Sequence, residues 1–161
     1  MSLLNLSQTI SKNVCCKQPL TSCSHMLHKF LQNYPYHIYP DVYNVFKTKD
    51  VKFVKKQYKV FPVFKDNVLK TDLIEWKPHA KYSFEDDPTI QAGIMVLLNG
   101  EMKEKVYHHE HLYFRYECLL HPNKAYTIDS FSYQNLLLNI TCNNMLTFHV
   151  SRVNNTVKNF S

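Results

Sequence analysis

Histidines and a glutamate in the middle of the chain have the types and spacing of metal ligands. They lie in the segment His108-His109-Glu110-His111 and, further along, at Glu117. Because alternate residues of a β-strand share a face, His109, His111 and Glu117 would project to the same side. Imidazole and carboxylate groups together bind divalent metals. The spacing therefore predicts a candidate metal site of His109, His111 and Glu117, and the alternative is a solvated polar strand end.

The order His-x-His followed by Glu partly resembles the first motif of the cupin family. This resemblance implies a β-barrel in which His109 and His111 are offered to one metal. The glycines that bracket the motif in cupins are absent here at the required spacing. His121 and His149 are the further histidines that such a site could use.

A second group of soft ligands lies near the N-terminus and comprises Cys15, Cys16, Cys23, His25 and His28. It contains no Cys-x-x-Cys pair, which regular zinc fingers use. The chain has five cysteines, an odd number, without the repeated pairs of a disulfide scaffold. We expect reduced thiols, and zinc binding or disulfide formation by these cysteines stays open.

The segment 47–61 combines basic and aromatic residues. Lysine side chains meet phosphates and aromatic rings stack on bases, so the segment predicts single-stranded nucleic acid as an alternative partner. The residues that would form this surface are Lys52, Phe53, Lys55, Lys56, Tyr58 and Lys59. An edge strand guarded by lysine would have the same sequence.

Catalytic motifs are scarce in this chain. Only two glycines, Gly93 and Gly100, occur in 161 residues, and phosphate-cradling loops need several. No serine lies in a Gly-x-Ser-x-Gly elbow, and residues 85–88 form an acidic segment expected to be a solvated turn. No catalytic residue and no cofactor is predicted, and the sequence favours a protein that is not an enzyme.

The elements expected to carry these residues are short strands. Val, Ile, Leu, Tyr and Phe alternate with polar residues in short runs separated by Asn, Asp, Pro and Lys, which is typical of antiparallel β-structure. The fold class predicted is all-β, an antiparallel β-sandwich or closed barrel over residues 41–161. Residues 1–40 are predicted to be an N-terminal arm, loosely ordered over 1–22, with a short helix over 24–31 and a Tyr/Pro linker. The strands are expected at 42–47, 51–64, 67–76, 80–84, 90–98, 104–108, 111–120, 125–131, 135–141 and 145–153.

Alternation and turn chemistry predict the strand faces and the turns. In the last strand, we expect Leu146, Phe148 and Val150 to point inward and Thr147, His149 and Ser151 to point outward. Burial of the strand on both sides would invert this assignment. Asn99-Gly100 predicts a type I′ hairpin turn, and Asn143-Asn144 predicts another. Residues 121–124 predict a turn in which proline fixes φ.

The segments Phe114–Ile128 and Gln134–Ile140 together have the texture of a strand, a Pro-Asn turn and further strands. This texture is similar to the telokin-like protein family of nuclear polyhedrosis viruses, over residues 42–153. The resemblance implies a compact β-sandwich or barrel with no recognised catalytic residues and suggests a viral protein.

The function predicted is a structural or accessory interaction module that acts through surface contacts with a protein partner or with a second copy. The net charge of +6 keeps nucleic acid as a possible partner. No apolar run approaches the roughly 18 residues of a spanning helix, so no membrane partner is expected. We expect the protein inside the cell, in cytoplasm or nucleus.

Overall fold

The computed structural model describes residues 3–13, 53–54, 57–83, 93–108, 114–122, 124–128 and 133–153. These residues form one helix, α1 (Leu3–Asn13), and ten strands. The strands are β1 (Phe53–Val54), β2 (Tyr58–Lys65), β3 (Leu69–Trp76), β4 (Lys81–Ser83), β5 (Gly93–Asn99), β6 (Met102–His108), β7 (Phe114–Leu120), β8 (Ala125–Ile128), β9 (Tyr133–Asn139) and β10 (Met145–Arg152). The helix predicted at 24–31, the Tyr/Pro linker and the strand predicted at 42–47 lie outside the described residues.

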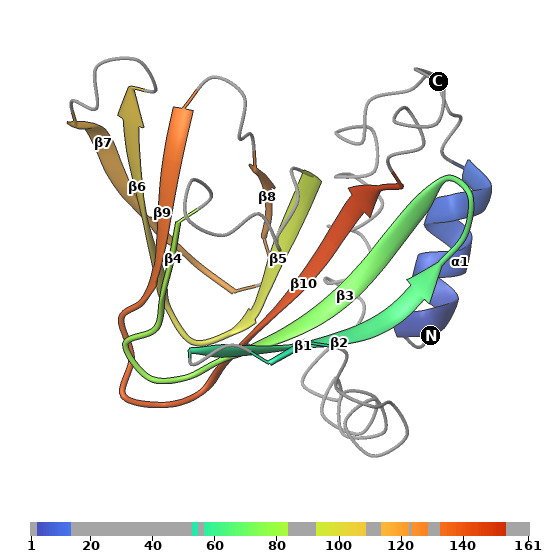
Figure 1. The fold of residues 1–161 in the computed structure, drawn as a ribbon, viewed down its shortest axis with the longest axis horizontal. Helices are drawn as coiled ribbons and strands as arrows, with labels where there is room; N and C mark the ends of the chain where they lie inside the picture. The colour runs from blue at the N-terminus through green and yellow to red at the C-terminus, as the bar shows by residue number, and fades with distance from the viewer. Residues whose placement is uncertain are drawn as a thin grey trace.

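The strands form two antiparallel sheets. One has six strands in the order β1-β2-β3-β10-β5-β8, and the other has four in the order β4-β9-β6-β7. In Figure 1 the two sheets stand as two layers that meet where β3 leads into β4 and β9 leads into β10. This arrangement confirms the predicted all-β sandwich.

Successive strands repeatedly change sheet. The chain passes from the six-stranded to the four-stranded sheet between β3 and β4, between β5 and β6 and between β8 and β9, and it returns between β4 and β5, between β7 and β8 and between β9 and β10. Only a few neighbours in the chain pair directly, such as β2 with β3 and β6 with β7. Two antiparallel sheets linked in this way form a jelly roll, an architecture that cupins share.

The two predicted hairpin turns are therefore wrong, because each connects strands of different sheets. Asn99-Gly100 lies between β5 and β6, and Gly100 has a φ of 84° whereas Asn99 ends β5. The Asn99 side chain accepts a hydrogen bond from the amide of Leu146 at 2.7 Å. Asn143-Asn144 lies between β9 and β10, where the Asn143 carbonyl accepts from the Asn139 amide at 3.0 Å. The chain does reverse direction at both predicted turns, but each turn leads from a strand of one sheet to a strand of the other sheet.

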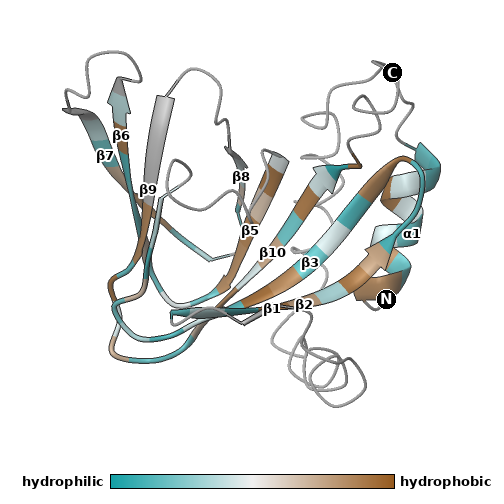
Figure 2. Cartoon of the chain, in the orientation of Figure 1, coloured by the Kyte–Doolittle hydropathy of each residue, from teal (hydrophilic) through white to brown (hydrophobic). Residues whose placement is uncertain are grey.

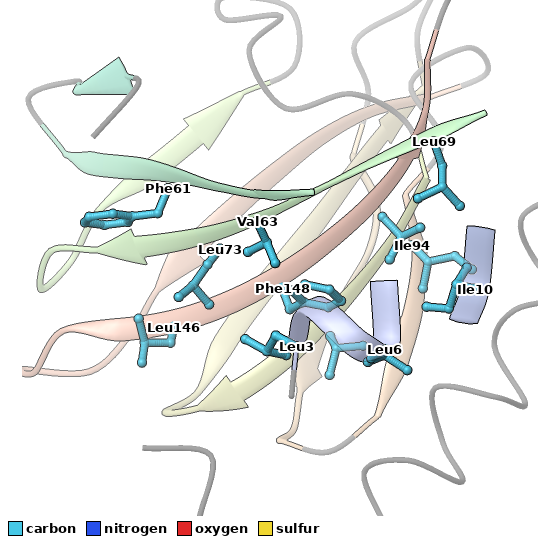
Figure 3. Close-up of a cluster of buried hydrophobic side chains, with 12 residues drawn as sticks. Leu3, Leu6, Ile10, Phe61, Val63, Leu69, Leu73, Ile94, Leu146 and Phe148 are labelled. Carbon is cyan, nitrogen blue, oxygen red and sulfur yellow. The ribbon is translucent and has the colours of Figure 1, made fainter. Parts of the chain in front are cut away.

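Helix α1 covers the outer face of the six-stranded sheet. Its residues Leu3, Leu6 and Ile10 recur on one face, and all three are fully buried against β10 and β5 side chains such as Phe148 and Ile94 (Figure 3). Burial of one such side chain contributes about 1.5–3 kcal/mol. The prediction of a loosely ordered arm over residues 1–22 is wrong for residues 3–13, which form α1. Its apolar residues recur at spacings of three and four, but the polar residues between them, mostly Ser, Asn and Gln, make this periodicity weak in the sequence.

Polar contacts fix α1 at two points. Ser7 and Thr71 of β3 share a hydrogen bond of 2.8 Å between their hydroxyl groups, and both are fully buried. The Ser11 hydroxyl donates to the carboxylate of Asp66, which also accepts from two amides of the β2–β3 turn. Burial by itself would raise the pKa of Asp66, but the hydrogen bonds from Ser11 and from the amides together hold that pKa below its usual value.

A second core fills the space between the two sheets. Its aromatic centre consists of Tyr58, Trp76 and Tyr82, with ring centroids 5.5 to 6.1 Å apart and two edge-on pairs. The aliphatic side chains around it come from both sheets: Val60, Ile74, Met95, Leu97, Met102, Leu120, Leu137 and Met145. The two cores together bury both faces of the six-stranded sheet. Along β3 and β10, hydrophobic residues are interspersed with hydrophilic ones (Figure 2).

Candidate functional site

The inner face of β10 carries a row of buried polar side chains. Thr147, His149 and Ser151 alternate with Phe148 and Val150, which pack under α1. The prediction that the polar set points outward is wrong, because α1 takes the apolar set on the outer face. The polar set consequently faces the space between the sheets.

A hydrogen-bond chain runs along this row. The indole Nε1 of Trp76 donates to the Thr147 hydroxyl at 2.8 Å, and that hydroxyl lies 2.7 Å from His149 Nε2. Since an indole N–H can only donate, the hydroxyl accepts from Trp76 and its own hydrogen is free to donate to Nε2. When the hydroxyl donates in this way, Nε2 is the acceptor and the imidazole proton is on Nδ1; in the other tautomer the second lone pair of the hydroxyl accepts from Nε2–H, and Nδ1 carries no proton.

His149 Nδ1 is buried and has no hydrogen-bond partner among the described residues. The residue is 5% exposed. A buried polar atom without a partner costs about 1–3 kcal/mol, so the arrangement calls for an explanation beyond packing.

The imidazole is neutral near pH 7. Burial lowers the pKa of His149 to about 3, and the charge of Lys70 lowers it as well. Lys70 and Asp72 of β3 lie opposite Ser151 and His149 in the register. Their charged groups are 3.8 Å apart, and their side chains are 26% and 17% exposed, so solvent reaches the edge of this row.

The four-stranded sheet contributes a second polar pair to the interior. The Cys118 thiol of β7 donates to a carboxylate oxygen of Glu104 on β6 at 3.7 Å. Burial raises the pKa of Cys118, and the charge and hydrogen bond of Glu104 raise it further. The thiol is therefore a poor nucleophile at neutral pH.

The structure places one of the three predicted metal ligands. His109 and His111 lie outside the described residues, whereas Glu117 is exposed on β7 and forms an ion pair of 3.8 Å with Lys103. Within the described ranges, no three His, Cys, Asp or Glu side chains are grouped so that they could hold a metal ion.

The predicted nucleic-acid surface is placed only in part. Lys52, Lys55 and Lys56 lie outside the described residues, and Phe53 is in β1, paired with Val60. Tyr58 is 3% exposed and its ring packs on Trp76. Because that ring is enclosed by the core, it is not available to stack on a base. Lys59 is partly buried on β2, opposite Glu75.

Strand β7 forms one edge of the four-stranded sheet and exposes apolar side chains. Its only sheet neighbour among the described strands is β6. Tyr116 is 51% exposed and Leu119 is 49% exposed. Tyr116, Cys118 and Leu120 share one face of β7, and of the three only Leu120 is fully buried.

Comparison with known proteins shows similarity of fold but no match in sequence. No protein-family model matches the chain, and no curated protein matches it. The oxalate decarboxylase of Lactobacillus farciminis, solved as a formate complex, is similar in structure with a TM-score of 0.50 and 14% identity, over 65% of this chain and 31% of that chain. The cupin domain of Schizosaccharomyces pombe Cnp3 has a TM-score of 0.48 and 14% identity, over 71% of this chain and 74% of that chain.

At these identities the likeness concerns the jelly-roll fold alone, in agreement with the strand order. The resemblance to the telokin-like family stays a prediction. In the part of the chain that the structure describes, no helix has the length and apolar character needed to cross a membrane.

Proposed function

We propose that the protein is a non-enzymatic interaction module whose β7 edge pairs with a second copy of the chain. The observation that carries this proposal is the exposure of Tyr116 and Leu119 on a strand that ends its sheet. An edge strand has unpaired backbone groups along one side, which can form a ladder with another strand. Apolar side chains beside such an edge add burial to the ladder.

The register within β7 limits how two copies can pair. Val106 is opposite Tyr116 and Tyr107 is opposite Phe114, so residue 115 is an extra residue in the ladder. The regular part is therefore 116–120. Two such segments pair antiparallel about Cys118, which places Glu117 of each copy opposite Leu119 of the other. Such a contact is isologous and closes as a two-fold dimer.

This register gives opposite expectations for two substitutions at one position. In the dimer, Leu119→Glu places a carboxylate opposite Glu117, and like charges directly opposite each other destabilise a pair. Leu119→Lys removes the same apolar side chain but places an ammonium opposite Glu117. Both contacts occur twice because of the symmetry, so the difference between the two variants is doubled.

The experiment is light scattering after size exclusion over a range of protein concentrations. We expect a concentration-dependent dimer for the wild type and for Leu119→Lys, and a monomer for Leu119→Glu. Leu4→Glu is the matched control, because Leu4 is an exposed apolar residue on α1, away from β7. A wild-type protein that stays monomeric throughout, or a Leu119→Glu variant that dimerises as well as the wild type, would refute the proposal.

A further inference from the structure

The buried row on β10 has a feature that folding alone does not use. With the Thr147 hydroxyl accepting from Trp76 and donating to His149 Nε2, the proton on Nδ1 has no acceptor among the residues that the structure describes. The complementary group is an oxygen acceptor. The polar side chains that the β3–β10 register places beside His149 decide what kind of acceptor fits: Lys70, Asp72 and Ser151.

Lys70 favours an anion at this position. Its Nζ is 3.8 Å from the Asp72 carboxylate, which is longer than a hydrogen bond, so the ammonium keeps donors for another acceptor. Burial is the main cause of the lowered pKa of His149, and the charge of Lys70 lowers that pKa further. Ser151 is buried next to Gly93, on the same face, and adds a hydroxyl. Asp72 is the one described group here whose charge opposes an anion.

We infer that the inner face of the six-stranded sheet binds a small carboxylate, which accepts hydrogen bonds from His149 Nδ1 and Lys70 Nζ. A carboxylate has two acceptor oxygens and can serve both donors at once. The partial exposure of Lys70 and Asp72 gives solvent access beside His149. This inference is independent of the β7 contact, because the carboxylate site lies on the other sheet.

The test is nuclear magnetic resonance of the full chain with 15N-labelled histidine at pH 7. The two ring nitrogens of a neutral imidazole differ widely in chemical shift, so the spectrum first reports whether the proton of His149 is on Nδ1. Acetate, malonate and succinate are then titrated, with chloride and inorganic phosphate as comparison anions. We expect saturable shifts of the His149 nitrogens with a carboxylate, and none with chloride.

Substitutions of charged residues at the site are expected to change the carboxylate affinity in opposite directions. Lys70→Met removes a charged donor and is expected to weaken carboxylate binding about tenfold or more. Asp72→Asn removes the opposing charge and is expected to strengthen it. Lys59→Met is the matched control, because Lys59 is a partly buried lysine of the same sheet whose parity places it on the opposite face.

Several outcomes would overturn the inference. One is the proton of His149 on Nε2, since Nδ1 would then lack a hydrogen to donate. Another is the absence of saturable shifts with every carboxylate at the highest concentration that leaves the protein folded. A response to phosphate alone would show that the site binds a different anion. Equal losses of carboxylate affinity in Lys70→Met and Lys59→Met would show that the net charge of the protein, and not a specific site, attracts the anion.

Discussion

Acidification from pH 7 to pH 5 should destabilise the protein through His149. The folded state holds the pKa of this imidazole at about 3, whereas the unfolded chain binds a proton near the ordinary value of 6.5. Unfolding therefore takes up a proton at any pH between these values. The stability is fully present above about pH 6.5 and is lost as the pH falls toward 3.

The size of the effect follows from the two pKa values. One pH unit corresponds to about 1.4 kcal/mol once the unfolded histidine is protonated, and the loss between pH 7 and pH 5 is about 2 kcal/mol. The residue is buried, so solvent screening does not reduce this figure. Lys70 opposes protonation of the imidazole, and Asp72, which lies opposite His149 on β3, is the nearby acid in the register.

The assay is urea unfolding at pH 7, 6 and 5. The single tryptophan, Trp76, is fully buried and its fluorescence reports the transition. The variant His149→Gln does not titrate, yet its amide oxygen can accept from the Thr147 hydroxyl. We expect the wild type to lose about 2 kcal/mol more than this variant between pH 7 and pH 5. Equal losses in both proteins would refute the assignment of a buried neutral imidazole, because all other histidines are common to both.

Three further predictions concern positions where the backbone or a thiol is constrained. Gly93→Ala should prevent folding or cost about 3 kcal/mol or more in the free energy of unfolding, because a Cβ there would lie 2.1 Å from a carbonyl oxygen of β10; circular dichroism with urea unfolding measures this, and a stable variant would contradict it. His79→Gly should raise stability by about 0.5–1 kcal/mol, because His79 has a φ of 58° in the turn before β4; a lower melting temperature would count against this reason. In a variant with serine at the three N-terminal cysteines, iodoacetamide should modify the exposed Cys142 well before Cys118, whose pKa is raised by burial and by Glu104; mass spectrometry follows both thiols, and faster reaction of Cys118 would exclude this environment.

The strands could be predicted because each one satisfies a local rule. Alternation of apolar and polar residues and the turn residues between the runs are visible within a few positions, and the expected strands from 67–76 to 145–153 overlap β3 to β10. The pairing of the strands is not local. The turn at Asn99-Gly100 can be predicted from its residues, but no residue near this turn indicates that β6 pairs with β7 and β9 instead of β5.

The candidate site could not be predicted, because it depends on what covers each face of β10. The alternation of Leu146, Phe148 and Val150 with polar residues was visible, and it is typical of a strand with one solvated face. The helix that buries the apolar set comes from the far end of the sequence. Once α1 lies there, Thr147 and His149 turn to the interior, and a residue expected on the surface becomes the centre of a buried hydrogen-bond chain.

The position of β10 at the middle of its sheet has a consequence for how the chain acquires its structure. β10 follows every other described strand in the sequence, yet it joins β3 to β5 and supplies Phe148 and Val150 to the core beneath α1. The hairpin of β2 and β3 already offers α1 the contacts at Thr71 and Asp66, whereas β5 joins this sheet only through β10. Because contacts so distant in sequence close slowly, the joining of β3 to β5 by β10 is expected to be a late step in folding.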